Sequence, residues 1–194
     1  MKKYRETAEE LEERLKELGF ETTCKVITNA VQLITPANPF RITLRINIST
    51  EGYMEFDSDD IFIAGKRFYF DSYTVDALME EVIKELKRRV EETLEDKLWY
   101  SPELETADDL KVTLLSLGFK KWDEDDEVIV LMFPFNFLWV RVSVYIYSDN
   151  GVSVCDDKNL SNKIFNLNEE PVSMVLDEVK KIILKHIDER GEEI

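Results

Sequence analysis

Apolar and polar residues alternate along this chain with two different periods, a helical period of three to four residues and a strand period of two residues. Between residues 8 and 18 the apolar side chains recur every three or four positions, which predicts an amphipathic helix. Residues 39–49 alternate apolar and polar side chains, the pattern of a strand with one buried face. Residues 75–94 return to the helical period. The pattern therefore predicts strands between two helices, an α+β arrangement.

The same order of elements occurs a second time. TAEEL at 7–11 returns as TADDL at 106–110, and LGF at 18–20 returns at 117–119, both 99 positions later. The alternating strand returns 98 positions later and the closing helix 97 positions later. Self-similarity at a nearly constant spacing indicates an internal repeat. The small drifts fall in expected connections, which accept insertions and deletions more readily than packed elements do.

We expect an α+β fold with internal duplication, in which two tandem α-β-β-β-(β)-α units occupy residues 1–98 and 99–194. Each unit is expected to form an antiparallel sheet with two helices packed on one face, because short turns join its successive strands. The strands are expected near residues 24–35, 39–49, 53–57 and 61–70, and again near 127–134, 137–147, 151–156 and 160–167. The last helix is expected over residues 171–190.

Each unit opens with a signal for the start of a helix. Thr7 with Glu10, and Thr106 with Asp109, have the spacing of a capping box, in which side chains satisfy the free backbone amides of the first turn. The glycine of each LGF motif is expected to adopt the left-handed conformation that ends a helix. Both units are therefore expected to begin in the same way.

The chain has 41 acidic and 25 basic residues, a formal net charge of −16. This balance argues against direct binding to nucleic acid, which requires a basic footprint, and favours basic partners or imitation of a polyanion. The 44% of apolar residues can build two cores, but no run of about 18 apolar residues occurs, and from the charged first residues we expect no signal peptide. We therefore expect a cytoplasmic protein, in which Cys24 and Cys155 stay reduced.

The second strand of each unit differs on its outward side. In the first unit this side presents Arg41, Thr43, Arg45 and Asn47, as expected for a half-solvated sheet. In the second unit it presents Phe135, Phe137, Trp139, Arg141, Ser143, Tyr145 and Tyr147. A fully exposed aromatic side chain forgoes burial worth about 1.5–3 kcal/mol. We therefore expect something to cover the outward side of the second unit.

Two kinds of cover are consistent with the sequence. Either the first unit or a second copy of the chain packs there, or the side is a docking surface on which aromatic and arginine residues anchor a protein partner. A platform for stacking nucleic-acid bases would use similar residues, but the net acidity disfavours it. The candidate partner or inter-repeat surface comprises Phe135, Phe137, Trp139, Arg141, Tyr145, Tyr147, Arg41 and Arg45.

Motifs for catalysis or cofactor binding are absent from the sequence. The six glycines serve helix ends, turns and the tail, and the chain has neither a P-loop nor a dinucleotide fingerprint. The only histidine, His186, is expected at a solvent-facing or boundary position, and there is no CxxC motif to build an ordinary zinc site. The acidic run at 123–127 lacks the glycine and the terminal glutamate of a calcium loop. We expect no catalytic residue, no metal and no cofactor.

The sequence is thus interpreted as a non-enzymatic acidic interaction module, with a regulatory, chaperone-like or inhibitory role. It is expected to bind a protein partner or a second copy of itself through an exposed sheet or helix surface, with no direct contact to nucleic acid or membrane. One alternative is a polyanion or DNA mimic that inhibits a nucleic-acid-binding protein. Another is a metal-dependent hydrolase or nuclease that uses Asp57, Asp156, Asp157 and Lys158.

Overall fold

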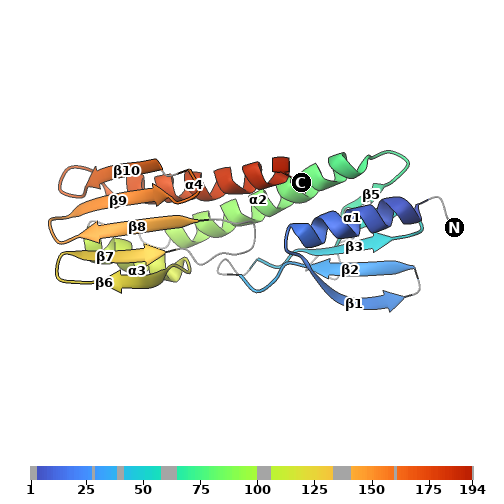
Figure 1. The fold of residues 1–194 in the computed structure, drawn as a ribbon, viewed down its shortest axis with the longest axis horizontal. Coiled ribbons are helices and arrows are strands. Elements are labelled where there is room, and N and C mark those ends of the chain that lie inside the picture. Colours follow the sequence, from blue (N-terminus) through green and yellow to red (C-terminus); the bar gives the residue numbers. More distant parts are fainter. Residues whose placement is uncertain are drawn as a thin grey trace. The chain divides into compact units, whose positions relative to one another are not determined.

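The computed structural model describes residues 4–27, 29–38, 42–57, 65–99, 106–132, 141–159 and 161–193. These ranges contain four helices and ten strands (Figure 1). The elements of the first half are α1 (Arg5–Glu17), β1 (Glu21–Ile27), β2 (Ala30–Ile34), β3 (Arg45–Ser49), β4 (Tyr53–Phe56), β5 (Arg67–Tyr69) and α2 (Val75–Trp99). Those of the second half are α3 (Ala107–Ser116), β6 (Lys120–Glu124), β7 (Val128–Met132), β8 (Val142–Tyr147), β9 (Gly151–Asp156), β10 (Ser161–Asn166) and α4 (Val172–Glu193).

The chain is an α+β protein that divides into two compact units. One unit comprises Met1–Leu86 with Arg190–Ile194, and the other comprises Lys87–Glu189. Strands β1–β5 form one five-stranded sheet in sequence order, and β6–β10 form another. Every pair of neighbouring strands is antiparallel, as short connections require. Helix α2 begins in the first unit and continues into the second.

The two sheets pair their strands in the same register. The pairs Ile46↔Phe56 and Met54↔Phe68 of the first sheet correspond to Val144↔Val154 and Val152↔Phe165 of the second. A register irregularity also falls at the same place, between Thr22 and Cys24 in β1 and between Lys121 and Asp123 in β6. The two sheets therefore have the same strand order and the same inward-facing positions.

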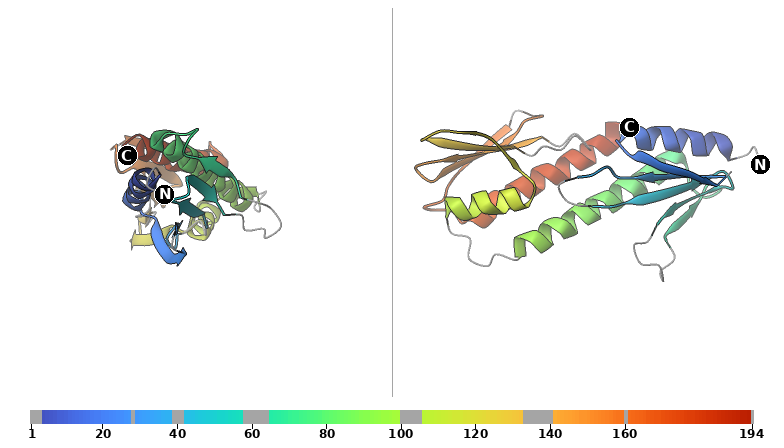
Figure 2. Two further views of the ribbon diagram at one scale, coloured as in Figure 1. Left: turned by 90° about the vertical axis from the view of Figure 1, so that its right-hand side faces the viewer. Right: turned by 90° about the horizontal axis from the view of Figure 1, so that it is seen from below.

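One face of each sheet is buried, and the helices supply its cover. In the first unit α1 contacts β2 and β3, and in the second α3 contacts β7. Figure 2 (right) shows α3 and α4 along one side of β6–β10. The buried apolar strand residues are Leu33, Ile46, Ile48, Met54, Phe56 and Phe68 in the first unit, and Leu131, Val142, Val144, Ile146, Val152, Val154 and Phe165 in the second. Each such side chain contributes about 1.5–3 kcal/mol when fully buried, so these inner faces hold the fold together.

Each sheet has five strands, more than the three or four that the sequence pattern predicts. The single strand predicted over 24–35 is wrong, because β1 and β2 form a hairpin there, and β6 precedes the strand predicted at 127–134. The hydrophobic pattern misses β6 because all five of its residues are exposed. Strand β6 is held in the sheet by its pairing with β7 and not by burial of its side chains.

The first helices of the two units begin differently. The capping box predicted at Thr106 is confirmed: the Asp109 amide donates to the Thr106 hydroxyl at 3.2 Å, and the Thr106 amide donates to the Asp109 carboxylate at 3.1 Å. The box predicted for Thr7 with Glu10 is wrong, because α1 already begins at Arg5 and no side chain caps it.

The same two helices end alike. Gly19 and Gly118 have φ of 97° and 101°, the left-handed conformation predicted from the LGF motifs. In both units the amide of the phenylalanine that follows donates to a carbonyl of the last helical turn at 3.0 Å. Glycine is suited to this position because any other side chain would be strained there.

Candidate functional site

The outward face of the second sheet is built from alternate positions of β6–β10, because successive residues of a strand point to opposite faces. Its central row, set by the pairing register, consists of Asp123, Val130, Tyr145, Ser153 and Ile164. Val128 and Tyr147 lie on one side of this row, and Met132, Ser143, Cys155 and Asn162 lie on the other. The apolar residues of this surface, which we call the apolar face, are Trp122, Val128, Val130, Met132, Tyr145, Tyr147, Cys155 and Ile164.

Trp122 lies at the register irregularity of β6. At the corresponding position of β1, the Thr23 hydroxyl donates to the side-chain oxygen of Gln32 at 2.9 Å, and Gln32 lies on the outward face. The irregularity therefore turns Thr23 outward in the first sheet. By the same geometry we place Trp122 on the outward face, beside Val130.

Several residues of the apolar face are open to solvent. The side chains of Trp122, Ile164 and Tyr147 are 75%, 73% and 40% exposed. Ser143 and Ser153, which lie between the larger side chains, are each only 3% exposed. The surface is thus a layer of large apolar side chains with small buried residues between them. Contiguous exposed apolar surface of this kind marks interaction sites in soluble proteins.

Polar residues occupy the same register positions on the outward face of the first sheet. The row there is Gln32, Asn47, Glu55 and Arg67. The Gln32 amide donates to Asn47 at 3.0 Å, and the Arg67 guanidinium donates to Glu55 at 2.9 Å. The same guanidinium lies 4.3 Å from the ring centre of Tyr53. These polar groups satisfy one another in contact with water. The same face also carries Tyr53 and Tyr69, of which Tyr69 is 55% exposed.

The surface residues predicted from the sequence fall in three places. Tyr145 and Tyr147 lie in β8, Arg141 immediately precedes it, and Arg45 lies on the outward face of β3 in the first sheet. Phe135, Phe137, Trp139 and Arg41 lie outside the described residues.

Sequence reasoning missed Trp122, Val130 and Ile164. The run of apolar residues in β7 hides which of its side chains face outward, and β10 has too few apolar residues to show alternation. Counting alternate positions from a core residue of each strand, Leu131 or Phe165, would have identified the outward neighbours.

Tyr145 stands near the centre of the apolar face. Burial raises the pKa of its phenol above the ordinary value, and the charges of Cys155 and Asp157 raise it further, so the hydroxyl stays neutral at physiological pH. The Ser143 hydroxyl beside it donates to the Asp157 carboxylate at 2.6 Å. The polar groups that border Tyr145 are thus paired with each other, which leaves apolar surface for contact with another molecule.

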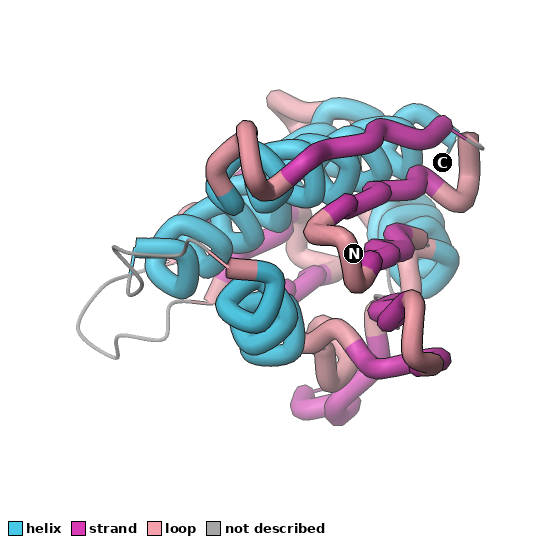
Figure 3. The backbone as a smooth tube through the Cα atoms, turned by 90° about the vertical axis from the view of Figure 1, so that its left-hand side faces the viewer, coloured by secondary structure: helices cyan, strands magenta, loops and turns pink. Residues whose placement is uncertain are grey.

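The two ends of the second sheet carry opposite charge. The β6–β7 turn, the β8–β9 turn and the segment between β10 and α4 lie at one end, which Figure 3 faces. This acidic end contains Asp125, Asp126, Glu127, Asp149, Glu169 and Glu170, and its connections at 125–127, 148–150 and 167–171 contain no lysine or arginine. The opposite, basic end contains Lys120, Arg141 and Lys158, with Asp157 beside them and Glu189 paired with Lys158 at 3.4 Å.

A cavity of about 290 Å³ opens at the acidic end. Its walls come from the start of α3 and from the ends of β6, β7 and β8, and include Asp108, Asp126 and Tyr147. Carboxylates therefore border one edge of the apolar face, where a cationic group of a partner would be attracted.

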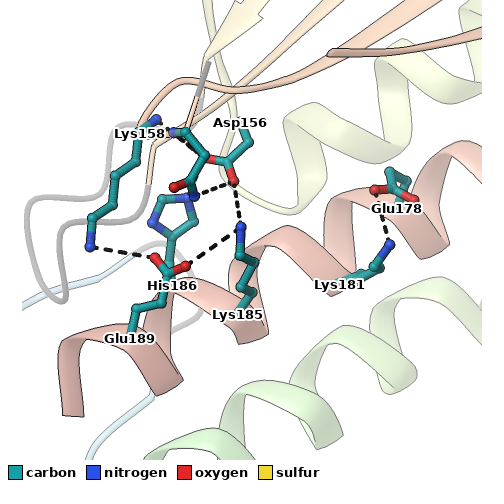
Figure 4. A network of polar contacts seen from close by, with 8 residues as sticks. Asp156, Lys158, Glu178, Lys181, Lys185, His186 and Glu189 are labelled. Carbon is teal, nitrogen blue, oxygen red and sulfur yellow. Dashed lines mark hydrogen bonds and ion pairs between the residues drawn. The ribbon is translucent and has the colours of Figure 1, made fainter. Parts of the chain in front are cut away.

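A buried polar cluster lies on the inner side of the same sheet (Figure 4). Asp156 of β9 and His186 of α4 are each 1% exposed, and His186 Nε2 lies 2.9 Å from Asp156 Oδ1. The Asp156 carboxylate also accepts hydrogen bonds from the side-chain amide of Asn159 at 2.7 Å and from the Lys185 ammonium at 3.3 Å. The solvent-facing or boundary position predicted for His186 is therefore wrong.

The sequence contains a signal for this pair. Val152, Val154 and Asp156 occupy alternate positions of β9, so Asp156 continues a row that faces the core. A carboxylate on a buried face requires a hydrogen-bonding partner, because an unpaired buried charge is very costly. His186 lies on the buried side of α4 and supplies that partner.

Asp156 is ionised in the folded protein. Burial alone would raise the pKa of its carboxyl, but hydrogen bonds from Asn159 and the charge and hydrogen bond of His186 outweigh burial and lower the pKa from 3.8 to about 2. With the carboxylate ionised, His186 Nε2 donates the hydrogen bond. The other ring nitrogen, Nδ1, is buried and makes no hydrogen bond among the described residues. The pair therefore fastens α4 to the end of β9.

The structure does not bring together the residues of the hydrolase alternative within one unit. Asp156 faces the core, Asp157 faces outward, and Lys158 pairs with Glu189 at 3.4 Å. Asp57 belongs to the other unit. Among the described residues, no group of three or more His, Cys, Asp or Glu side chains has an arrangement that could hold a metal ion.

Cys155 is a free thiol, and within the described ranges no helix combines the length and the apolar character needed to cross a bilayer. The apolar face, the acidic end and the buried cluster are the features from which a function can be inferred. No protein-family model, no curated protein and no solved structure matches the chain.

Proposed function

We propose that this chain is a non-enzymatic acidic interaction module whose apolar face binds a protein partner. The observation that carries the proposal is the contrast between the two outward faces at equal register. Where the first sheet has mutually paired polar side chains, the second has Tyr145 and Ile164. The shared fold requires apolar residues on the inner face alone, so the apolar outward face serves a purpose other than folding.

The energetics of the apolar face support a docking role. Removal of apolar surface from water contributes about 25 cal/mol per Å², and large aromatic residues provide most of the binding energy in protein interfaces. Trp122 and Ile164 are three-quarters exposed in the chain by itself, so most of their surface is available for burial by a partner. The carboxylates of the acidic end favour a partner surface that carries positive charge opposite them.

We also propose that the two units arose by internal duplication. Support comes from the shared strand order, the shared register and the repeated TAEEL/TADDL and LGF motifs. The surface positions of the two units differ in both directions. Val112 and Leu115 of α3, 67% and 41% exposed, occupy the positions of Glu13 and Lys16 in α1, whereas Tyr69 and Tyr73, 55% and 40% exposed, occupy the positions of Asn166 and Glu170. Duplication supplies a second folded unit whose surface can change while its inner face stays the same.

A second candidate function rests on the acidic end. Six carboxylates without an intervening base, beside a cavity, favour an acidic decoy that blocks a nucleic-acid-binding protein. Binding through the acidic end would weaken steeply as salt is raised, because screening shortens the range of charge attraction. Binding through the apolar face would change little. Measurement of partner capture between low and high salt therefore distinguishes the two candidates.

Site-specific photo-cross-linking tests the proposal directly. A photoreactive amino acid at position 145 reports contacts of the apolar face, and the same group at position 47, which has the same register in the first sheet, is the matched control. We expect a discrete protein adduct from position 145 in the source cell and none from position 47. The adduct should disappear with Ile164→Arg. Equal labelling from both positions would contradict a docking role for the apolar face.

A further inference from the structure

We infer that the occupant of the apolar face is a second copy of this chain, packed face to face about a two-fold axis that runs across the strands. The inference rests on the proposed function, because it requires the apolar face to be a docking surface. It adds the identity of the partner and the orientation of the two copies. The charge distribution of the second sheet supports it independently.

The apolar residues of the central row can contact the same residues of a second copy. Tyr145 and Ile164 are its large apolar side chains in β8 and β10. An axis across the strands places each strand on the same strand of the partner, so Tyr145 of one copy packs beside Tyr145 of the other. In a two-fold dimer every contact occurs twice, so both copies bury these side chains. Two sheets packed in this way lie about 10 Å apart, the spacing of an ordinary sheet sandwich.

The charges at the two ends of the sheet select one orientation. A two-fold axis parallel to the strands would place the acidic end of one copy on the acidic end of the other, and the like charges would repel. An axis across the strands places each acidic end on the basic end of the partner. Asp125 and Asp126 of one copy then approach the end that carries Lys120 and Arg141 in the other.

The same charges favour a second copy over an unrelated basic protein. A uniformly basic partner would complement the acidic end and would be repelled by the basic end. A copy of this chain presents both signs at the required separation, because that separation is the length of the same strands. A two-fold interface must be self-complementary, and this surface is self-complementary in charge.

Sedimentation of the full chain tests the inference. We expect a species of twice the chain mass of 22.8 kDa. The double variant Tyr145→Asn with Ile164→Arg installs the residues that the first sheet carries at these positions, and we expect it to weaken association about tenfold or more. The matched control, Asn47→Ala with Arg67→Ala, changes the first sheet and should leave association unchanged. Circular dichroism and thermal melting establish that each variant is folded.

Charge reversal tests the orientation. Lys120→Glu with Arg141→Glu makes both ends acidic and should weaken the dimer about tenfold, an effect that shrinks in high salt. Addition of Asp125→Lys with Asp126→Lys to the same chain places lysines opposite the new glutamates of the partner and should restore the dimer. Failure to restore it, while the wild type is dimeric, would overturn the axis across the strands.

The outcomes separate this inference from the proposed function. A wild-type chain that sediments as a monomer up to millimolar concentration overturns the inference; an adduct of position 145 with a different protein would then still support the docking role. The inference is also overturned if the dimer persists in the double variant Tyr145→Asn with Ile164→Arg and a photoreactive group at position 145 gives no adduct between copies. The contact would then lie elsewhere. A monomer without any adduct contradicts both proposals.

Discussion

The outward faces of the two sheets differ although their inner faces agree. At one register level the first sheet carries Gln32, Asn47, Glu55 and Arg67, and the second carries Val130, Tyr145, Ser153 and Ile164. The inner positions are apolar in both sheets, since their burial drives folding. The outward positions are under no such constraint. The difference between the sheets is therefore not required by the fold, and it is the difference on which the proposed docking role of the second sheet rests.

The second unit also differs on its inner side. Among the described residues, Asp156 and His186 are the titratable side chains that are fully buried, and both belong to this unit. A buried carboxylate with its hydrogen-bonding partner contributes little net stability when the contact is complete, but removal of one partner leaves the other unpaired and is strongly destabilising. The unit with the apolar outward face thus depends on a polar contact in its core.

The largest predicted effect concerns that core contact. Asp156→Ala should lower the free energy of unfolding of the second unit by about 3–5 kcal/mol, because His186 and Lys185 lose their common acceptor. Hydrogen exchange of the amides in β9 and α4 measures the effect locally. Asp157→Ala is the matched control, since its side chain faces outward, and it should cost much less. Equal losses in the two variants would show that the buried Asp156 carboxylate stabilises the unit no more than the outward-facing Asp157 carboxylate does.

Acid should weaken the same contact. The folded-state pKa of Asp156, about 2, lies below its ordinary value of 3.8, so ionised Asp156 contributes stability that is complete above pH 3.8 and is lost as the pH falls towards 2. The shift corresponds to about 2 kcal/mol. Denaturant titrations between pH 2 and neutrality should show this loss in the wild type. Asp156→Asn should show a shallower acid dependence, and an identical dependence would contradict the assignment.

The comparison can also be tested by giving the first sheet the outward side chains of the second. Gln32→Val, Asn47→Tyr and Arg67→Ile give the first sheet the side chains of the second. We expect the first unit to remain folded, because these positions face outward, and to acquire an association about tenfold stronger than before. Sedimentation and binding of a hydrophobic dye provide the measurement. If the variant stays as soluble and as weakly associating as the wild type, then apolar content alone does not create the docking surface.

The smallest predicted effect compares the two helix starts. Thr106→Ala removes a capping box and should cost about 1 kcal/mol. Thr7→Ala alters a residue inside α1 and should change stability by less than about 0.5 kcal/mol. Thermal melting of the two variants provides the comparison. Similar costs would mean that Thr7 caps a helix in solution as Thr106 does.

Part of the fold was predictable because it depends on local periodicity. The alternation of Val142, Val144 and Ile146 and the helix ends at Gly19 and Gly118 follow from the sequence alone. The hairpin between β6 and β7 was not predicted, since the exposed β6 shows no apolar period. Its turn did have a signal: the Asp125 carboxylate accepts hydrogen bonds from the amides of residues 127 and 128 at 2.8 and 2.7 Å, an arrangement typical of aspartate in turns.

The candidate site was predictable to a smaller extent. Tyr145 and Tyr147 were identified because an aromatic residue opposite a buried row is conspicuous in the sequence. Ile164 and Trp122 were not, because their place on the same surface depends on pairing between strands that lie far apart in the chain. His186 was assigned to the wrong environment for a similar reason. Its partner, Asp156, is 30 positions away along the chain.

By itself the sequence determined the α+β class, the inner faces of the central strands and the excess of negative charge, because each depends on residue type and short-range period. The tertiary structure decided which side chains share the outward surface and which carboxylate meets the histidine. Both of these depend on strand register, and register is fixed by the packing of the whole sheet. A shift of one residue would have moved every outward side chain to the inner face.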